Sequence, residues 1–184
     1  MNPIALVTGA RGGIAIGDKI LFVGAAIEAN LFTDAAFEAA ELAAQQSLNG
    51  LMKIGPAARQ ALRKEVSALL AVGGAGEKYA DRILVDAAAC TMHMPNNVNN
   101  FSDFFAGIHH VINAGRVTRP DQPVLPNYRY VPVAYHSRAS SVRVSGSPLK
   151  RPNGQYQQPG HEAPVFGPCQ RLDYEIELGV WIGQ

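Results

Sequence analysis

The sequence has little of several features that define common classes of protein. Only 2 of its 184 residues are cysteine, and neither Cys90 nor Cys169 belongs to a Cys-x-x-Cys pair, so we expect no disulfide framework and a reducing compartment. No run of apolar residues approaches the roughly 18 that a membrane helix needs. The N-terminus is apolar but has no basic region before it, so it is not a signal peptide. These absences predict a soluble, cytoplasmic protein with no membrane partner.

An excess of charge of one sign is also missing. The chain carries 16 Lys and Arg against 15 Asp and Glu, which gives a formal net charge of +1. Nucleic-acid-binding proteins usually concentrate a basic excess on one face, so we expect no nucleic-acid partner. What is present is ordinary for a globular protein: 47% of the residues are hydrophobic, and the length suits one medium domain or two small ones.

A glycine-rich run near the N-terminus resembles the nucleotide-binding turn of short-chain dehydrogenases. It spans Thr8 to Ile14, and such a turn brings backbone amides to a pyrophosphate just before a helix begins. The residues that follow predict two short strands around a Gly17-Asp18 turn in place of that helix. Ala15 also stands where the third glycine is expected, and none of the 6 tyrosines is followed four residues later by a lysine. Nucleotide binding therefore remains only as a disfavoured alternative.

The secondary-structure pattern changes near residue 95. Before it, alanine-rich helical spacing predicts a helix over residues 33–48 with Thr33 as its N-cap, and a second helix runs from Pro56 to Val72. After it, the spacing of apolar residues predicts a third helix over residues 102–114. Apolar or alternating patterns predict strands at residues 83–85, 130–135, 141–145 and 172–178.

Acidic residues in the last of these strands are suited to binding a cation. Residues i and i+2 of a strand point to the same face, so Glu175 and Glu177 project side by side with Cα atoms about 7 Å apart. Asp103, Gly107 and His110 fall along one stripe of the third predicted helix, where the glycine leaves space between the carboxylate and the imidazole. Together these residues make up most of a carboxylate metal site with a histidine beside it.

Each candidate residue also has a purely structural explanation. An aspartate such as Asp103 is ordinary in the first turn of a helix, where the helix dipole favours negative charge. A histidine such as His110 more often packs or faces solvent than takes part in catalysis. Glu175 and Glu177 would equally suit the solvent face of an antiparallel strand. Only the motifs around these residues shift the balance towards function.

Several short motifs follow one another in a fixed order from Asp103 to Glu177. The most specific is the Tyr-His-x-Arg-Ala-Ser-Ser stretch of residues 135–141. In order and spacing the motifs closely resemble the fumarylacetoacetase family, strongly over residues 91–183 and more loosely towards the N-terminus. The motifs are Asp103-Phe104-Phe105 with His110, Pro126-Asn127-Tyr128, Pro132 to Ser141, Val144-Ser145-Gly146, Arg151 to Gln155, Pro164 to Cys169 and Leu172 to Glu177.

The resemblance implies a metal-dependent hydrolase of carbon–carbon bonds. The family's substrate is 4-fumarylacetoacetate, which is cleaved to fumarate and acetoacetate at the end of tyrosine and phenylalanine degradation. By residue match, Asp103, Glu175 and Glu177 would ligate Ca²⁺ or Mg²⁺, hard cations that prefer oxygen ligands. His110 would be the general base that activates water, since a histidine can accept a proton near neutral pH.

The resemblance also assigns residues to the substrate, with some departures from the family pattern. Arg119 and Tyr135 match positions that hold the substrate, and an arginine suits a carboxylate because it can bond both oxygens. Phe105 stands where the family has a substrate-binding tyrosine, and Ser137 replaces a glycine. Phe105 leaves an alternative open, namely another diketone hydrolase of the same superfamily that acts on acylpyruvate-type substrates.

The fold implied by the resemblance is α+β, mainly β. Residues 1–95 would form a small N-terminal domain, an SH3-like β-barrel with helices. Residues 96–184 would form the truncated start of a catalytic domain of the mixed β-sandwich roll type. Family members are more than twice this length, and their later residues supply further ligands and contacts. We therefore expect a homodimer when the protein is full length and no activity from this chain alone; a non-catalytic, partner-binding product is a further alternative.

Overall fold

The chain forms two compact units. The computed structural model describes residues 4–7, 11–131, 133–136 and 138–184. One unit consists of residues 1–95 with residues 144–184, and the other consists of residues 96–143. Helices occur together with small antiparallel sheets, which confirms the predicted α+β class.

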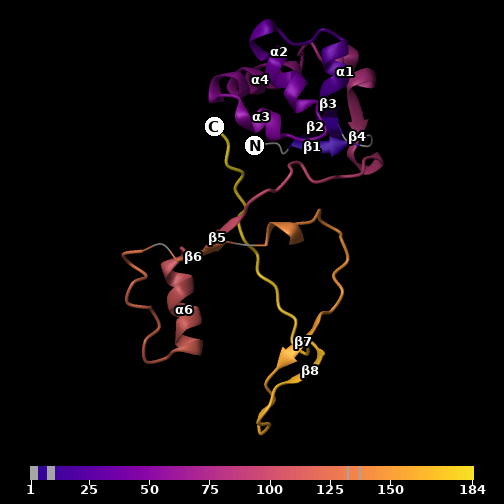
Figure 1. Ribbon diagram of the computed structural model, residues 1–184. Coiled ribbons are helices and arrows are strands. Elements are labelled where there is room, and N and C mark those ends of the chain that lie inside the picture. The colour runs from indigo at the N-terminus through magenta and orange to yellow at the C-terminus, as the bar shows by residue number, and fades with distance from the viewer. Residues whose placement is uncertain (1–3, 8–10, 132, 137) are drawn as a thin grey trace. The chain divides into compact units, whose positions relative to one another are not determined.

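The first unit contains a four-stranded antiparallel sheet (Figure 1). Its strands lie in chain order, so each strand pairs with the next one along the sequence. Among the described residues this sheet is open at both edges, so the expected closed SH3-like barrel is not confirmed. The strands are β1 (Ile4–Val7), β2 (Arg11–Ile16), β3 (Lys19–Phe22) and β4 (Leu84–Asp86).

β2 and β3 form the hairpin that the sequence predicts. Ile16 pairs with Lys19, which leaves a two-residue turn between the strands. The first turn residue, Gly17, has φ +57°, in the left-handed region that glycine adopts without a steric penalty. Of the glycine-rich run, Thr8, Gly9 and Ala10 lie outside the described residues, whereas Gly12 and Gly13 lie within β2 and not in a loop that opens a helix.

The helices of the first unit follow the predicted pattern in part. α2 begins at Asp34, but the Thr33 hydroxyl donates its hydrogen bond to the Glu65 carboxylate and does not cap the helix. α2 ends at Ala43, earlier than the predicted residue 48. α4 begins at Pro56, as predicted for a proline in the first turn of a helix. The helices are α1 (Val23–Glu28), α2 (Asp34–Ala43), α3 (Asn49–Lys53), α4 (Pro56–Leu69) and α5 (Ala80–Ile83), with short 3-10 turns η1 (Glu77–Tyr79) and η2 (Ala87–Ala89).

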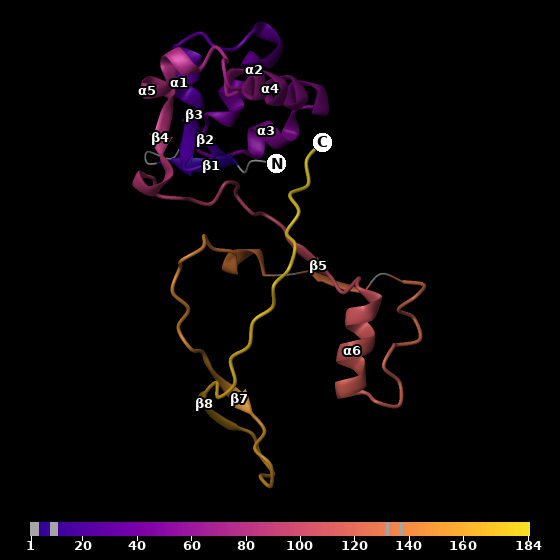
Figure 2. The same ribbon diagram turned by 180° about the vertical axis from the view of Figure 1, so that it is seen from behind.

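Small side chains on α2 allow α4 to pack closely beside it. Four alanines of α2 are buried in the same core as three apolar residues that recur at helical spacing on α4. Figures 1 and 2 show the two helices side by side from opposite directions. Because an alanine ends at Cβ, it leaves room for the longer side chains of the neighbouring helix at normal packing density. The core includes Ala36, Ala39, Ala40, Ala43, Leu62, Val66 and Leu69, with Leu21, Val23, Ala26 and Ile83 from other elements.

Gly12 marks a very close approach between the sheet and α2. A Cβ atom at this position would lie 1.5 Å from the carbonyl oxygen of Ala43 and 2.7 Å from its carbonyl carbon. Any larger residue would therefore push the last turn of α2 away from β2. This packing explains a glycine of the N-terminal run without a bound phosphate.

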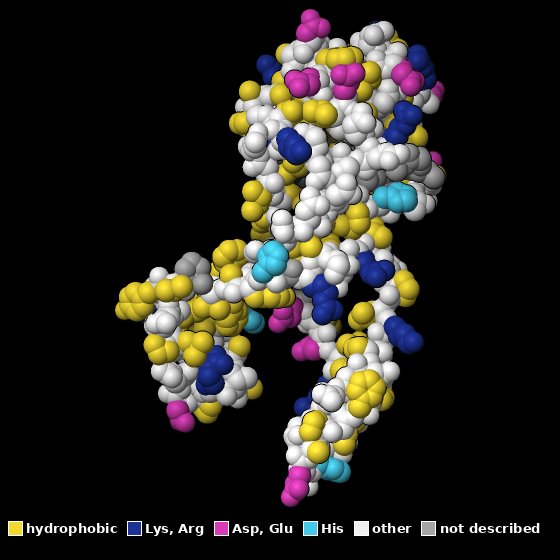
Figure 3. Space-filling view, viewed as in Figure 1, with side chains coloured by type: hydrophobic (Ala, Val, Ile, Leu, Met, Phe, Trp, Pro, Cys, Tyr) yellow, Lys and Arg dark blue, Asp and Glu magenta, His cyan; other side chains and the backbone are white. Residues whose placement is uncertain are grey.

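The surface and the helix lengths agree with the composition. Figure 3 shows acidic and basic side chains interspersed over the first unit, on the face in view. The longest helix in the described ranges, α4, has 14 residues and carries several charged side chains. None of the helices described combines the length and the apolar character that crossing a membrane would need.

A surface ion pair joins β3 to β4 and should make stability depend weakly on pH. Lys19 and Asp86 stand opposite each other in the register, and the hydrogen bond and charge of Asp86 raise the pKa of Lys19 above its ordinary value of 10.5. A raised pKa means that the pair stabilises the folded chain at neutral pH and that this contribution is lost as the pH rises through the folded-state pKa. We expect Asp86→Asn to lower the melting temperature slightly at pH 7, because both groups are exposed. The difference from wild type, followed by scanning fluorimetry, should shrink as the pH is raised beyond 10.5.

The second unit is a two-stranded ribbon with one helix. β5 (Ser102–Phe104) pairs antiparallel with β6 (Ala134–His136), and α6 (Ile108–Thr118) lies between them in the sequence, with the 3-10 turn η3 (Ala139–Ser141) following β6. The prediction of one helix over residues 102–114 is therefore wrong at its start. The backbone groups of β5 are paired with β6, and this distant pairing overrides the local helical spacing of the apolar residues.

The C-terminal part of the chain contains one hairpin, of β7 (Asn153–Tyr156) and β8 (Val165–Pro168). Two other predicted strands in this part of the chain are not observed. Residues 142–145 follow η3 without forming a strand, and residues 172–178 are exposed and outside any helix or strand. A strand needs a neighbouring strand to pair its backbone groups, and the described residues form no such strand beside either segment.

Candidate metal and substrate site

Asp103 and Tyr135 are neighbours across the ribbon of the second unit. They stand directly opposite each other in the register of β5 and β6, a position in which Cβ atoms lie about 5 Å apart on one face. The Asp103 side chain is partly buried, and Tyr135 is 62% exposed. The ribbon thus places a carboxylate beside a phenol that remains accessible from solvent.

Phe105 connects this ribbon to α6. Its N–H donates a hydrogen bond to the Val133 carbonyl oxygen at 2.9 Å, which extends the ribbon by one residue past β5. Alternation along the extended backbone puts the Phe105 side chain on the same face as Asp103. The Phe105 ring meets the His110 ring edge to face, with centroids 5.2 Å apart and planes at 88°. Phe105 therefore follows Asp103 on one face of the extended backbone and contacts His110 with its ring.

His110 lies in the first turn of α6, which begins just after Gly107. The Val111 N–H donates to the Gly107 carbonyl oxygen at 2.9 Å, and the Val111 side chain is buried. Gly107 thus precedes the helix and does not interrupt it, so the predicted helical stripe of Asp103, Gly107 and His110 is wrong. A Cβ at Gly107 would meet the His110 Cβ at 3.6 Å, an ordinary contact, so the glycine is not needed to make space beside the imidazole.

Arg119 lies at the end of α6 opposite to His110. Its N–H donates to the Gly115 carbonyl oxygen at 2.6 Å, and its own carbonyl oxygen accepts from the Gln122 N–H at 3.0 Å. The two positions are nine residues apart (119 − 110), so at about 1.5 Å per residue they lie roughly 13 Å apart along the helix axis. Arg119 is therefore placed to meet a part of a ligand that is remote from His110.

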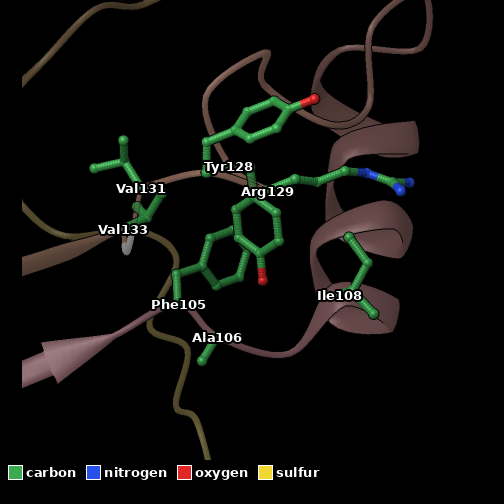
Figure 4. A pocket seen from close by; sticks show the side chains of 8 residues that line it. Phe105, Ala106, Ile108, Tyr128, Arg129, Val131 and Val133 are labelled. Atoms are coloured by element: carbon green, nitrogen blue, oxygen red, sulfur yellow. The ribbon is translucent and has the colours of Figure 1, made fainter.

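The loop after α6 returns along the helix and helps to form a pocket. A Cβ at Gly115 would lie 2.0 Å from the Pro123 carbonyl oxygen, so a glycine is needed for the loop to lie this close. The pocket has a volume of about 610 Å³ and lies where residues 128–131 and Val133 meet Phe105, Ala106 and Ile108. Figure 4 shows these side chains around it, and Figure 3 shows hydrophobic side chains gathered where β5, β6 and the start of α6 meet.

Two residues of this pocket were not assigned a role from the sequence, although one of them, Tyr128, belongs to the Pro126-Asn127-Tyr128 motif. The Tyr128 ring packs edge to face against Phe105, with centroids 6.3 Å apart and planes at 75°. Arg129 is the charged residue among the described residues that line the pocket, and Figure 4 shows its side chain extending towards α6. The available signal was the alternation of aromatic and basic residues at Tyr128-Arg129-Tyr130, a composition common in binding sites. Their closeness to Phe105 depends on the return of the loop, which local patterns do not reveal.

The three predicted carboxylate ligands fit a hard cation by chemistry, and they come from both units of the chain. Asp103 belongs to the second unit, whereas Glu175 and Glu177 belong to the exposed segment after β8 in the first. The side-by-side strand geometry expected for the two glutamates is absent. In the described ranges no three His, Cys, Asp or Glu side chains are grouped so that they could hold a metal ion. Carboxylate oxygens are nevertheless the donors that Ca²⁺ and Mg²⁺ prefer.

Comparison with known proteins finds one family over most of the chain. Residues 6–95 match the sequence profile described as "Fumarylacetoacetase N-terminal". This matched stretch covers the sheet and the helices of residues 4–89 almost completely. The glycine-rich run thus belongs to the matched region, and its described part, from Arg11 onwards, lies in β2.

Curated relatives extend the similarity through the second unit. The chain is 38% identical over 177 residues to a fumarylacetoacetase of Caenorhabditis elegans, a match that covers 93% of this chain and 42% of the relative. It is 39% identical over 178 residues to that of Oryza sativa subsp. japonica and 35% identical over 179 residues to that of Homo sapiens, each match covering 94% of this chain and 42% of the relative. The chain thus spans about two fifths of the length of these relatives, and it belongs to the fumarylacetoacetase family.

Proposed function

We propose that the full-length protein hydrolyses the carbon–carbon bond of 4-fumarylacetoacetate to fumarate and acetoacetate. The observation that carries this proposal is the convergence of Asp103, Tyr135, Phe105 and His110 in the second unit. Asp103 and Tyr135 share one face of the ribbon. Phe105 follows on the same face, and its ring contacts the ring of His110. The relatives named fumarylacetoacetase support the same reaction.

His110 acts as the general base in this proposal. Its neutral imidazole accepts a proton from water, whose oxygen adds to a substrate carbonyl carbon. The bond between this carbon and the neighbouring one then breaks, and the electron pair leaves on the acetoacetate side as an enolate that takes up a proton. Phe105 holds the imidazole by its edge contact. Tyr135 donates a hydrogen bond to a substrate oxygen, and Arg119 pairs with a remote carboxylate of the substrate.

Asp103, Glu175 and Glu177 are the residues that would hold a divalent cation, Ca²⁺ or Mg²⁺. A cation at this site supplies Lewis-acid polarisation of the diketone oxygens and stabilises the enolate charge. The all-carboxylate donor set supports such a hard ion, because both cations are bound by oxygen ligands in proteins.

The family also supports a wider arrangement, which we propose for the full-length protein. Residues 1–95 form its N-terminal domain, related to an SH3-like barrel, and residues 96–184 open a catalytic domain of the mixed β-sandwich roll type. The protein works as a cytoplasmic homodimer, with residues outside this chain completing the site. The 184-residue chain alone is inactive in this arrangement.

The direct test is turnover by the purified full-length protein. With Mg²⁺ or Ca²⁺ present, we expect fumarate and acetoacetate in equal amounts, measured by chromatography as the substrate absorbance falls. Chelation with EDTA should abolish product formation, and added cation should restore it. Absence of both products would contradict the proposal. Faster turnover of an acylpyruvate would favour the alternative substrate class, for which the apolar Phe105 in the pocket is the supporting feature.

Substitution of glutamate by glutamine can show whether a carboxylate binds the cation or is an ordinary surface group. We expect Glu175→Gln and Glu177→Gln each to lower kcat at a fixed Mg²⁺ concentration by about ten-fold or more and to raise the Mg²⁺ concentration needed for half-maximal rate. Glu162→Gln is the matched control, because Glu162 is also exposed and lies in the loop between β7 and β8. Equal Mg²⁺ dependence in all three variants would exclude the two glutamates as ligands.

A further inference from the structure

The corner between α3 and α4 holds the chain at Gln184. The Gln184 N–H donates a hydrogen bond to the Met52 carbonyl oxygen at 3.0 Å. The Arg59 guanidinium donates to the Gln184 carbonyl oxygen through Nη2. The contact therefore uses only backbone groups of Gln184 and depends on the side chain of Arg59.

Arg59 binds two segments of the chain with one side chain. Its Nη1 donates to the carbonyl oxygens of Met52, at 3.1 Å, and of Ile54. Both carbonyls lie at the C-terminal end of α3, where backbone oxygens have no partner within the helix. A guanidinium can also reach Gln184, because its donors are fixed in a planar fork, whereas a lysine has a single nitrogen.

Gly183 shows independently that the backbone passes close to α3. A Cβ atom at Gly183 would lie 2.7 Å from the Met52 carbonyl oxygen and 3.1 Å from the Met52 Cε. The nearer contact is with backbone, so no change of rotamer would relieve it. A Cβ atom at Gly179 would meet no atom of the described residues within 4 Å, so the close approach begins after Gly179.

A second anchor precedes the two glutamates that we propose as cation ligands. The Cys169 N–H donates to the Pro152 carbonyl oxygen at 2.8 Å, and Arg151 donates to the Cys169 carbonyl oxygen at 2.6 Å. Residues 170–182, which we call the carboxylate segment, run between these two anchors and contain both glutamates. At each anchor an arginine side chain binds a backbone carbonyl oxygen.

We propose that Arg59 is a positioning residue for Glu175 and Glu177 in the full-length protein. By holding the far end of the carboxylate segment, Arg59 restricts the positions that both carboxylates can take, so less conformational entropy is lost when they bind a cation. Glu177 lies seven residues before Gln184 (184 − 177), so even an extended chain keeps it within about 25 Å of this anchor. The role of the two glutamates rests on the proposed function, whereas the contact between Arg59 and Gln184 does not.

The test uses two substitutions in the full-length protein, each with a matched control. Gly183→Ala pushes the chain away from α3 without altering the sequence of α3 or α4, and Gly179→Ala adds the same methyl group to the same segment without a clash. Arg59→Lys keeps the charge but loses the fork, and Arg63→Lys makes the same change one turn later on α4, where the arginine is exposed. Hydrogen exchange followed by mass spectrometry reports on the Gln184 N–H, and calorimetry with Mg²⁺ alone reports on cation affinity.

We expect Gly183→Ala and Arg59→Lys to speed exchange in peptides that contain Gln184, because a released N–H exchanges faster. Both should weaken Mg²⁺ binding by about ten-fold, as loss of a contact that supports metal ligands commonly does. Both controls should match wild type. Wild-type exchange or wild-type Mg²⁺ affinity in Gly183→Ala, or no Mg²⁺ binding by wild type, would overturn the inference. If wild type binds Mg²⁺ but forms no products from 4-fumarylacetoacetate, the proposed reaction fails while exchange and calorimetry still decide the role of Arg59.

Discussion

Gly12→Ala is expected to be among the most damaging single substitutions in the first unit. The added methyl group would lie 1.5 Å from the Ala43 carbonyl oxygen, far inside van der Waals contact. The clash is with backbone, so no change of rotamer can relieve it, and α2 must move away from β2. Overpacking of a dense core commonly costs about 1–3 kcal/mol, and a backbone clash belongs at or above the upper end of that range. Urea unfolding of the full chain measures the loss directly.

Substitutions of two other glycines serve as controls. They distinguish the effect of the steric clash at Gly12 from the general effect of replacing a glycine. At Gly154 of β7 an added Cβ atom would meet no other atom within 4 Å, so Gly154→Ala should change stability by less than about 0.5 kcal/mol. Gly17 also has open space but a φ of +57°, so Gly17→Ala should cost about 1–2 kcal/mol through backbone strain alone. If Gly12→Ala were no more damaging than Gly17→Ala, the close packing of β2 on α2 would be wrong.

His110→Asn is expected to have the largest effect on activity. Asparagine keeps a polar side chain but cannot accept a proton near neutral pH, so the attacking water loses its base. Removal of a general base typically lowers the rate about 10²–10⁴-fold. The loss should fall on kcat more than on KM, because the base acts on water in the transition state and does not hold the substrate. Steady-state kinetics of the full-length protein with 4-fumarylacetoacetate provide the measurement.

The neighbouring histidine provides the control for this experiment. His109 lies on the same turn of α6 and is exposed, as His110 is, but the ring contact with Phe105 belongs to His110. His109→Asn should therefore leave kcat within about two-fold of wild type, as expected for a surface substitution away from the site. Comparable losses in both variants would point to damage of α6 as a whole and would remove His110 from its proposed role.

Several elements could be predicted from the sequence because their causes are local. The hairpin of β2 and β3 follows from a glycine-containing turn between two apolar runs, and α4 follows from Pro56 and the spacing of Leu62, Val66 and Leu69. The family could be predicted as well, because its motifs depend on order and spacing along the chain. For the same reason Asp103, His110 and Tyr135 could be named as candidates before their positions were known.

Other features depend on contacts between residues that are distant in the sequence. The apolar spacing after Ser102 fits a helix, yet residues 102–104 form a strand because residues 134–136 pair with them. The alternation of residues 172–178 fits a strand, yet no described strand pairs with them and no strand forms. A periodic pattern determines which face of an element is apolar, but only a partner for the backbone hydrogen bonds decides whether that element exists.

The sequence by itself determined the α+β class, the local turns and helix starts, and the membership of the family. Only the tertiary structure decided that Gly12 serves packing against α2 and that the Phe105 ring meets the rings of His110 and Tyr128. The reason is physical: turns and caps arise from residues next to one another, whereas a close approach or a ring contact is set by where the backbone returns. The return of the loop after α6, which Gly115 permits, is the clearest example.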